Sequence, residues 1–599
     1  MLNEPTRDKL KALKLDAMAQ AWDEQQRNPE VQKLNFDERF GMLVDEDWEW
    51  GLRDHPESAT QVGDRRYDDK LDDMSLEAIE RRKVHAREML ARAKKIDASK
   101  LGEVDRTNLA LFVRNYEIAV EGQRFPDELL VLNQLYGVHR ELADIAEIMP
   151  RKTVADHENF LKRIAAYPAL VDQHIALLRR GVEKKITPPR IVMRDVVKLI
   201  ENQVSDDVEK SFTYETAFTH FPETIPEADR ARLQAAAKRA LAEQAMPALR
   251  KFRDFVARDY LPKTRETTGL SSLPDGQAWY AYNARATTTT DMSPEKIHAL
   301  GLSEVARIRG EMTKIMKQTG FTGTLPEFFK FLRSDPRFFY TDKEALLTGY
   351  REICKRIDPE LPRLFGTLPR LTYGVKPVPA HSEKTQTTAY YVWGAPDIGR
   401  AGTFYANTYD LATRPKWEME ALTLHEAVPG HHLQIALSQE QGELPKFRRY
   451  GGYTAFVEGW GLYAESLGPE IGLFVDPYSH FGQLTYEMWR AVRLVVDTGM
   501  HVKGWSRDQA ITYFKDNAGK TEHDIIVEID RYIVWPGQAL AYKIGQLKLR
   551  ELRTLAEKSL GPKFDARTFH DLILGAGALP LDVLEKRVRA TLSPSKPPK

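Results

Sequence analysis

The sequence contains very little cysteine and no long hydrophobic run. Cys354 is the only cysteine among 599 residues, so neither an intrachain disulfide nor a cysteine-based zinc cluster can form. We expect Cys354 to be a small buried hydrophobic residue rather than a nucleophile. No stretch approaches the roughly 20 apolar residues of a transmembrane helix, and residues 1–5 do not begin a signal peptide. These absences predict a soluble, cytoplasmic protein without a membrane span.

The sequence also lacks an excess of either charge. Lysine and arginine number 87, aspartate and glutamate number 87, and the formal net charge is +0. This balance excludes a globally basic nucleic-acid-binding protein and an acidic tail protein. Hydrophobic residues make up 42% and charged residues 29%, which is ordinary for a globular protein that buries a large core without disulfides.

Apolar residues recur at three- and four-residue spacing through most of the chain, which is typical of helices packed on one face. The segments with this pattern are residues 74–97, 103–122, 127–148, 158–184, 226–258, 293–318 and 548–560. Runs of β-branched and aromatic residues at 370–373, 388–393 and 403–409 predict a small antiparallel sheet. We therefore expect a mainly α fold, in which a large helical body with a deep cleft carries a small antiparallel sheet along that cleft.

The most informative segment is residues 425–432, HEAVPGHH. A helical zinc site needs two imidazoles about one turn apart and a carboxylate next to the first. The position one turn after His425 is Pro429, whereas His432 has the right phase but would lie ~10.5 Å along a regular helix. Because Pro429 cannot donate to the carbonyl of residue 425, we expect a local bulge that brings His431 into place. His431 is therefore favoured over His432 as the second ligand.

A third ligand is expected from the apolar and aromatic segment that follows. Glu458 lies 27 residues after His431 and has no polar neighbours in sequence. An isolated buried carboxylate is costly, so we expect Glu458 to be paired with a metal ion. Glu465 lies two helical turns further on, on the same face, and is expected to orient one of the histidines.

These segments carry a resemblance to a known family. Residues 414–434 and 458–463, together with residues 56–68, resemble the bacterial family of unknown function DUF885, and the resemblance covers about residues 48–590. Members of that family are similar in outline to zinc metallopeptidases of the gluzincin type. The resemblance implies one Zn²⁺ held by His425, His431 and Glu458, with Glu426 as the general base for hydrolysis of peptide bonds. This chain departs from the usual gluzincin pattern by two extra residues between the histidines.

A second group of polar residues follows from helical spacing alone. In a helix over residues 486–502, Arg490, Arg493, Asp497 and His501 fall on one narrow face among apolar neighbours. Such a narrow stripe favours a buried helix that presents polar groups to a cavity. We expect His501 to donate to the tetrahedral intermediate, Arg490 or Arg493 to pair with a substrate carboxylate, and Asp497 to support them from behind.

Further residues are assigned to substrate contact. Tyr532 and Tyr542 flank a Pro-Gly turn, and we expect Tyr532 to stabilise the oxyanion with Tyr542 behind it in the substrate-binding region. Residues 402–408 are expected to form an edge strand that pairs with an extended peptide, to which Asn407 adds a side-chain contact. The alternative function is a zinc hydrolase that acts on a non-peptide amide or ester.

The first 48 residues differ from the rest of the chain. Their pattern resembles the N-terminal helical segment of the ATPase helper of bacterial insertion elements, which suggests a foreign start and an alternative role as a non-enzymatic adaptor of transposition. The other interpretation is an unrelated pair of amphipathic helices. A phosphate loop for such an ATPase is missing, since Phe514 occupies the required first glycine before residues 519–521. We expect three parts: residues 1–48, a peptidase-like domain over 49–590, and a flexible tail over 591–599. If the original start has been replaced, an exported or periplasmic location is the alternative.

Overall fold

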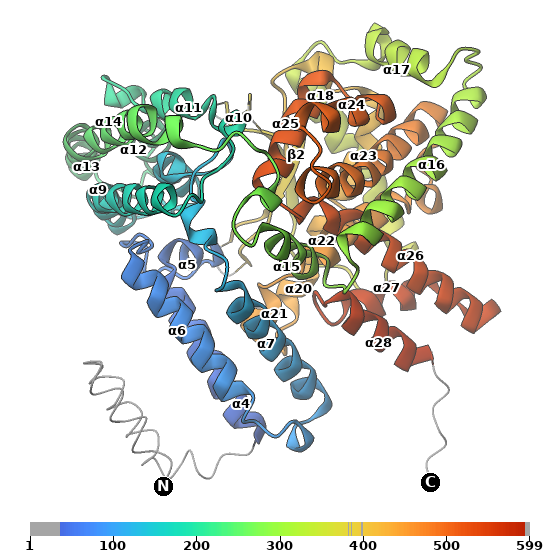
Figure 1. Cartoon of the computed structure of the whole chain (residues 1–599), viewed down its shortest axis with the longest axis horizontal. Coiled ribbons are helices and arrows are strands. Elements are labelled where there is room, and N and C mark those ends of the chain that lie inside the picture. The colour runs from blue at the N-terminus through green and yellow to red at the C-terminus, as the bar shows by residue number, and fades with distance from the viewer. Residues whose placement is uncertain (1–35, 381–382, 385, 397–398, 593–599) are drawn as a thin grey trace. The chain divides into compact units, whose positions relative to one another are not determined.

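A computed structural model describes residues 36–380, 383–384, 386–396 and 399–592 of the chain (Figure 1). The described residues form two compact units. The smaller unit comprises residues 36–51, 80–123 and 445–447, and the larger one comprises the remaining described residues. In this part of the chain no helix has an apolar stretch of the length needed to cross a membrane.

The described part of the chain is mainly helical, which confirms the predicted fold class. The α-helices are α4 (Phe36–Asp54), α5 (Pro56–Val62), α6 (Leu76–Ala93), α7 (Glu103–Gly122), α8 (Glu141–Ile148), α9 (Val154–Glu183), α10 (Arg190–Met193), α11 (Val196–Gln203), α12 (Phe212–Phe218), α13 (Glu227–Ala240), α14 (Met246–Phe255), α15 (Gly276–Thr288), α16 (Pro294–Gln318), α17 (Leu325–Ser334), α18 (Lys343–Ile357), α19 (Met419–Glu426), α20 (His431–Glu440), α21 (Lys446–Arg449), α22 (Thr454–Glu465), α23 (Pro477–His501), α24 (Arg507–Asn517), α25 (Glu522–Val534), α26 (Ala541–Leu560), α27 (Ala566–Leu574) and α28 (Leu581–Leu592).

The smaller unit has its own hydrophobic core. Phe40, Leu43 and Val44 of α4 are buried against apolar side chains of the two helices that follow in this unit. Phe40 and Phe112 meet edge to face, with ring centroids 6.3 Å apart. The boundary expected between residues 48 and 49 therefore falls inside the continuous helix α4. Residues 1–35, which carry most of the resemblance to the insertion-element protein, lie outside the described residues.

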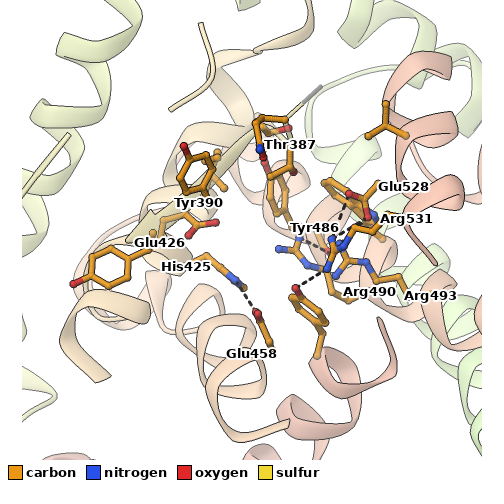
Figure 2. Close-up of a pocket in the computed structure, with 18 of the residues that line it drawn as sticks. Thr387, Tyr390, His425, Glu426, Glu458, Tyr486, Arg490, Arg493, Glu528 and Arg531 are labelled. Atoms are coloured by element: carbon orange, nitrogen blue, oxygen red, sulfur yellow. Dashed lines mark hydrogen bonds and ion pairs between the residues drawn. The ribbon is translucent and has the colours of Figure 1, made fainter. Parts of the chain in front are cut away.

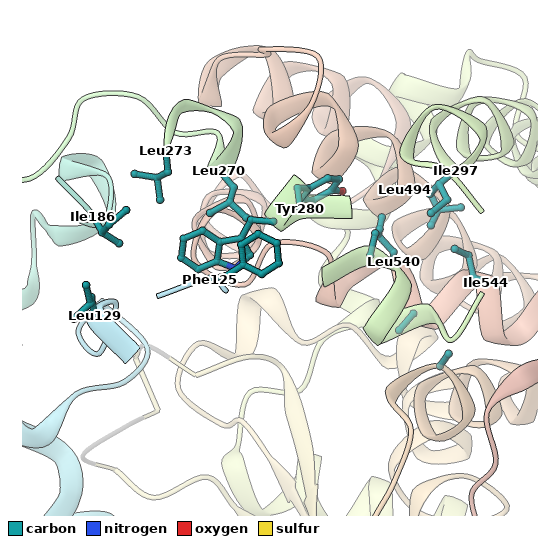
Figure 3. Close-up of a cluster of buried hydrophobic side chains, with 14 of the residues drawn as sticks. Phe125, Leu129, Ile186, Leu270, Leu273, Tyr280, Ile297, Leu494, Leu540 and Ile544 are labelled. Carbon is teal, nitrogen blue, oxygen red and sulfur yellow. The ribbon is translucent and has the colours of Figure 1, made fainter. Parts of the chain in front are cut away.

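The core of the larger unit joins segments that are far apart in sequence (Figure 3). Phe125 stacks on Trp279 with ring centroids 5.6 Å apart, and both belong to one buried cluster with Leu494 of α23 and Leu540. Burial of such large apolar side chains contributes roughly 1.5–3 kcal/mol each. This cluster fixes α23 and the start of α26 relative to the helices that precede the sheet.

Two pairs of long helices in the larger unit approach closely at glycines. At Gly301 of α16, a Cβ atom would lie 2.7 Å from the Leu494 Cβ atom and 2.8 Å from Val495 Cγ2 of α23. At Gly459 of α22, a Cβ atom would lie 2.5 Å from the Cα atom of Gly545 in α26. Side chains at these positions would force the helices apart. The glycines therefore bring α22 and α26 together at the point where both carry candidate site residues.

The sheet differs from the expected one in two respects. Strands β1 (Tyr373–Pro377), β2 (Ala389–Val392) and β3 (Gly402–Ala406) are arranged in the order β1-β3-β2. β3 pairs in parallel with β1 and antiparallel with β2, so the sheet is mixed rather than antiparallel. β3 is the central strand, and the expectation that residues 402–408 form an edge strand is wrong. The strand that lies at an edge beside the cavity described below is β2.

The segment 127–148 is not the single helix that its apolar spacing predicts. Only α8 at its end is α-helical, and residues 130–137 form an irregular connection. The Asn133 side chain accepts hydrogen bonds from the backbone N–H groups of Leu135 and Tyr136, at 2.8 and 3.2 Å. A short polar side chain that satisfies nearby backbone groups in this way competes with the helix.

Candidate metal centre and adjoining cavity

The HEAVPGHH segment is divided between two short helices. α19 ends directly before residues 427–430, and α20 begins at His431. The Val428–Pro429 peptide bond in the connection is cis. Gly430 is required there because a Cβ atom would overlap the carbonyl oxygen of His425. The expected bulge within one helix is therefore a complete break, after which a second helix starts.

This break places His431 beside His425. The two rings are nearly perpendicular, at 84°, and their centroids lie 4.7 Å apart. The Nε2 atom of each faces one carboxylate oxygen, Glu458 Oε2, at 3.6 Å from His425 and 3.5 Å from His431. One candidate ligand atom of each residue lies within 4.8 Å of the other two. The structure thus brings together the three residues that the sequence predicted as metal ligands. Figure 2 labels two of them, His425 and Glu458.

Helix α22 supplies both carboxylates around His425. Glu458 and Glu465 lie on the same helical face, and Glu465 Oε1 is 2.8 Å from His425 Nδ1. Between them, Gly461 lets the imidazole pack on the helix backbone, since a Cβ atom there would lie 2.8 Å from Cε1 of His425. His425 is 2% exposed and Glu465 is fully buried. The expected role of Glu465 in orienting a histidine is consistent with this contact.

The charges of the cluster are strongly coupled. Burial alone would lower the pKa of His425, but its contacts with Glu458 and Glu465 outweigh burial and raise that pKa to about 9. Burial alone would raise the pKa of Glu458, but the two histidines hold that pKa well below its usual range. Glu458 is therefore an anion in a partly buried place that attracts positive charge.

His432 points away from the cluster. Its Nδ1 atom lies 2.9 Å from the Tyr391 hydroxyl, and its Nε2 atom lies 3.0 Å from the carbonyl oxygen of Leu371. Burial lowers the pKa of His432 to about 4, so the ring is neutral near pH 7. Of the two candidates for second ligand, the structure places His431 with the other two ligands and His432 against the sheet.

A cavity of about 350 Å³ opens beside the three candidate ligands. Its wall includes His425, Glu426, His431 and Glu458 from the cluster, and residues 386–391 from β2 and the segment before it. Glu426 is 8% exposed and lies next to His425 at the end of α19. A carboxylate there faces the same space as the cluster, which is the placement a general base requires.

Three predicted substrate contacts also line this cavity: Arg490, Arg493 and Tyr542. The Arg493 guanidinium carbon lies 4.3 Å from the centroid of the Tyr542 ring, and that ring stacks on His425 with centroids 6.5 Å apart. Arg493 also pairs with Glu528 at 3.0 Å. Figure 2 shows the arginines gathered on one side of the cavity and the histidine–glutamate pair on the other.

His501 and Asp497 do not reach the cavity, although the same helix carries them. His501 Nδ1 accepts a hydrogen bond from the Leu270 N–H, and its Nε2 atom donates to the Tyr532 carbonyl, both at 2.9 Å. Asp497 accepts from the Tyr280 hydroxyl at 2.5 Å, and burial raises its pKa to about 7. Residue 501 lies ~12 Å further along the helix than residue 493, because each residue adds about 1.5 Å. The shared angular face is thus divided between the cavity and the core.

Tyr532 and Asn407 act behind the cavity wall rather than on it. The Tyr532 hydroxyl donates to Glu528 at 2.5 Å and accepts from Arg493 at 2.7 Å, and Tyr532 is fully buried. Its predicted contact with an oxyanion is therefore wrong in this arrangement, because its proton is already engaged. The Asn407 amide donates to the carbonyl oxygens of residues 383, 386 and 387, so it holds the segment before β2 instead of contacting substrate.

The sequence reasoning missed several cavity residues, chiefly Tyr486, Trp489, Arg531 and Glu528. Tyr486 lies one turn before Arg490 and two turns before Arg493. The polar face of α23 that lines the cavity therefore extends from Arg493 toward the start of the helix rather than toward its end. Glu528 and Arg531 are three residues apart on α25, but nothing in the local sequence indicates that they face a cavity.

Fold and site together define a mainly helical protein with a largely buried His–His–Glu cluster on the wall of a cavity. The chain belongs to the bacterial family of proteins of unknown function DUF885, whose match covers residues 56–588, and this confirms the family resemblance. No curated protein matches the chain.

Two solved structures are similar to this chain over most of its length. The crystal structure of a candidate lipoprotein from Colwellia psychrerythraea has a TM-score of 0.89 and 27% sequence identity, covering 93% of this chain and 100% of that one. A candidate lipoprotein of unknown function from Shewanella oneidensis has a TM-score of 0.68 and 17% identity, covering 92% of this chain and 99% of that one. The second similarity concerns the fold alone.

Proposed function

We propose that this protein is a zinc-dependent peptidase that hydrolyses peptide bonds with Glu426 as general base. The observation that carries the proposal is the cluster of His425, His431 and Glu458, whose candidate ligand atoms lie within 4.8 Å of one another on the wall of a cavity. Two histidines and one glutamate are a ligand set used by catalytic zinc in peptidases.

The dimensions and chemistry of the cluster fit zinc. At zinc–ligand distances of roughly 2.0–2.2 Å, two ligands of a tetrahedral ion are separated by ~3.4 Å. The two distances from Glu458 Oε2 to the histidine nitrogens, 3.5 and 3.6 Å, are close to that separation. In the part of the chain that the structure describes, Glu458 Oε2 is buried and has no hydrogen-bond partner, which leaves it available to a cation.

When bound, a zinc ion would polarise a water molecule and the substrate carbonyl group. The Glu426 carboxylate takes the proton that the attacking water loses and passes it to the amine nitrogen that leaves. Glu465 holds Nδ1 of His425 at 2.8 Å and so aims Nε2 of that ring toward Glu458. The two carboxylates that line the cavity beside His425 thus have different tasks: Glu426 transfers protons and Glu458 binds the metal.

Tyr542 is the phenol best placed to meet a developing oxyanion. Its hydroxyl accepts a hydrogen bond from Arg531 at 3.1 Å. A guanidinium group can only donate, so the phenolic proton of Tyr542 is left for another acceptor. Its ring stacks on His425 with centroids 6.5 Å apart, and Tyr542 lines the same cavity as the cluster. We assign to Tyr542 the role that the sequence analysis gave to Tyr532.

A peptide is the substrate that the cavity favours. Strand β2 is an edge strand of the sheet, and its residues Ala389, Tyr390 and Tyr391 line the cavity. Unpaired backbone groups of such an edge can bind an extended peptide main chain by β-addition. We therefore assign the docking of the peptide to β2 instead of the expected strand at residues 402–408. An ester or a small amide would make much less use of it.

The test is hydrolysis of a panel of short peptides, matched esters and small amides by the full-length protein. Chelation should abolish peptide cleavage, and added Zn²⁺ should restore it. Cleavage of the esters or amides alone would replace the peptidase proposal by the alternative hydrolase. Activity that is unaffected by chelation would overturn the role of the metal.

We extend the proposal to the place where the protein acts. The Colwellia psychrerythraea relative is described as a candidate lipoprotein, and that description fits an exported protein rather than the cytoplasmic one expected from the sequence. Fractionation of cells that produce the native gene product would test this: recovery in the cytoplasm alone would contradict export.

A further inference from the structure

One face of α23 presents a row of hydrogen-bond donors to the cavity. Tyr486, Arg490 and Arg493 follow one another at four and then three residues, so they lie on the same side of the helix. All three line the cavity, and all three are buried, at 1%, 5% and 3% exposure. Figure 2 shows them together on the opposite side of the cavity from Glu426.

Several of these donors have nothing to bind within the described residues. The atoms without a hydrogen-bond partner are the Tyr486 hydroxyl, Arg490 Nε and Arg493 Nη1. A buried donor that stays unsatisfied destabilises the protein, so an unsatisfied donor in the wall of a cavity marks a place where a ligand can bind. The two arginine nitrogens can donate hydrogen bonds but cannot accept them, which points to a ligand that accepts hydrogen bonds.

The side of the cavity formed by Tyr486, Arg490, Arg493 and Arg531 is called the arginine wall, and its charges also favour an anion. Arg490, Arg493 and Arg531 line it, and their carboxylate partners are Glu465 and Glu528. Glu465 is shared with His425, and Glu528 is shared between two arginines and the Tyr532 hydroxyl. The wall therefore keeps an excess of positive charge in a place that is shielded from water, where it attracts a negative group strongly.

This wall lies close to the candidate metal centre. The Tyr542 ring contacts both the guanidinium of Arg493 and the imidazole of His425. Arg490 reaches Glu465 at 3.4 Å, and the same oxygen contacts His425. An extended peptide advances about 3.3–3.6 Å per residue, so a negative group on this wall would belong to a residue adjacent or nearly adjacent to the reacting carbonyl.

We propose that Tyr486, Arg490, Arg493 and Arg531 form a subsite that binds a carboxylate of the substrate. The inference rests on the proposed peptidase function for the identity of the substrate, but not for the existence of the anion site. The carboxylate has two sources with the same chemistry, the C-terminus of a peptide and an aspartate or glutamate side chain. A C-terminal source makes the protein an enzyme that releases one or two residues from peptide C-termini.

The experiment is calorimetric binding to the full-length Glu426→Gln variant, in which bound peptides should stay intact. The probes are Ala-Ala-Phe with a free carboxylate, its C-terminal amide, and Ala-Asp-Phe amide. We expect the free acid to bind about 10- to 100-fold more tightly than the neutral amide, the scale of hydrogen bonds to a charged group. Tight binding of the aspartate-containing amide would assign the subsite to a side chain, and weak binding would assign it to the C-terminus.

Tyr486→Phe is the mildest test of the subsite itself. It removes a hydroxyl that has no partner in the described residues, so folding should be unaffected while the preference for the acid falls about tenfold. Arg531→Gln should also reduce the preference. Arg507→Gln is its matched control, because the Arg507 side chain is 16% exposed against 15% for Arg531 and binds Asp530 outside the cavity. The control should keep the preference.

Equal affinity for the acid and both amides would overturn the subsite. So would an unchanged preference in both Tyr486→Phe and Arg531→Gln. Peptide hydrolysis by the wild-type protein is measured separately, so that the two proposals fail independently. A preference for the acid without any hydrolysis would leave the subsite and remove the peptidase, and hydrolysis without a preference would do the reverse.

Discussion

Gly461→Ala should damage the metal centre although the residue is not a ligand. A Cβ atom at this position would lie 2.8 Å from Cε1, 2.9 Å from Nε2 and 3.0 Å from Nδ1 of His425. Ordinary contacts between non-bonded carbon atoms are about 3.5–4.0 Å, so the ring must shift by roughly 0.5–1 Å. That shift would disturb both the 2.8 Å contact with Glu465 and the position of Nε2 opposite Glu458.

The expected result is a loss of zinc affinity of about 10- to 100-fold, as when a group that orients a ligand is removed. Overpacking should cost ~1–3 kcal/mol of stability, partly offset by the better helix propensity of alanine. Zinc affinity is measured by competition with a chelator, and folding by thermal melting. Gly310→Ala is the matched control, because Gly310 also lies inside a helix and a Cβ atom there meets nothing within 4 Å. Zinc binding by Gly461→Ala as tight as in wild type would refute the reasoning.

Three further predictions follow from other parts of the structure. His431→Ala should empty the zinc site. His432→Ala should lose two hydrogen bonds, which costs about 1–3 kcal/mol of stability, and should weaken zinc binding by at most ~10–100-fold. Metal analysis and thermal melting of both variants test this. The reverse pattern would make His432 the ligand. Burial lowers the pKa of His501 to about 4, below its unfolded value near 6.5, so the unfolded chain binds the proton first and stability is lost as pH falls from 6.5 toward 4. In urea unfolding at pH 7 and pH 5, His501→Asn should show about 2 kcal/mol less acid destabilisation than wild type, and an equal loss in both would contradict this. A chain that starts at residue 49 should be less stable than the full chain, because the truncation cuts α4 and removes Phe40, Leu43 and Val44 from the core. A chain that starts at residue 36 should keep the zinc content and turnover of the full chain. Equal melting of the 49-start and full-length chains would contradict the first part, and loss of turnover by the 36-start chain the second.

The helical body could be predicted because its signals are local. The apolar spacing at 103–122 matches α7 in full, and that at 293–318 differs from α16 by one residue. The segment 127–148 has the same spacing but is mostly irregular, because the Asn133 side chain binds the backbone instead. The order of the strands could not be predicted, because β3 pairs with residues that precede it by up to about thirty positions, and no local signal reports such a partner.

The candidate metal centre was recognisable because its chemistry is concentrated in a few residues. His425, Glu426 and His431 lie within seven residues of sequence, and Glu458 is conspicuous as a carboxylate among apolar residues. The cavity wall was only half predicted. Helical spacing correctly placed Arg490 and Arg493 on the same face of α23. Spacing gives the angular position of a residue around the helix axis but not what packs against each turn, so it could not show that His501 faces the core instead of the cavity.

We propose that Glu426 moves protons at a zinc site that it does not help to hold. The most direct measurement is zinc content and peptide hydrolysis of the purified full-length protein, wild type beside Glu426→Gln. We predict about one zinc per chain in both and a loss of turnover by several orders of magnitude in the variant only. Absence of zinc from the wild type after reconstitution, or full peptidase activity in Glu426→Gln, would contradict the account.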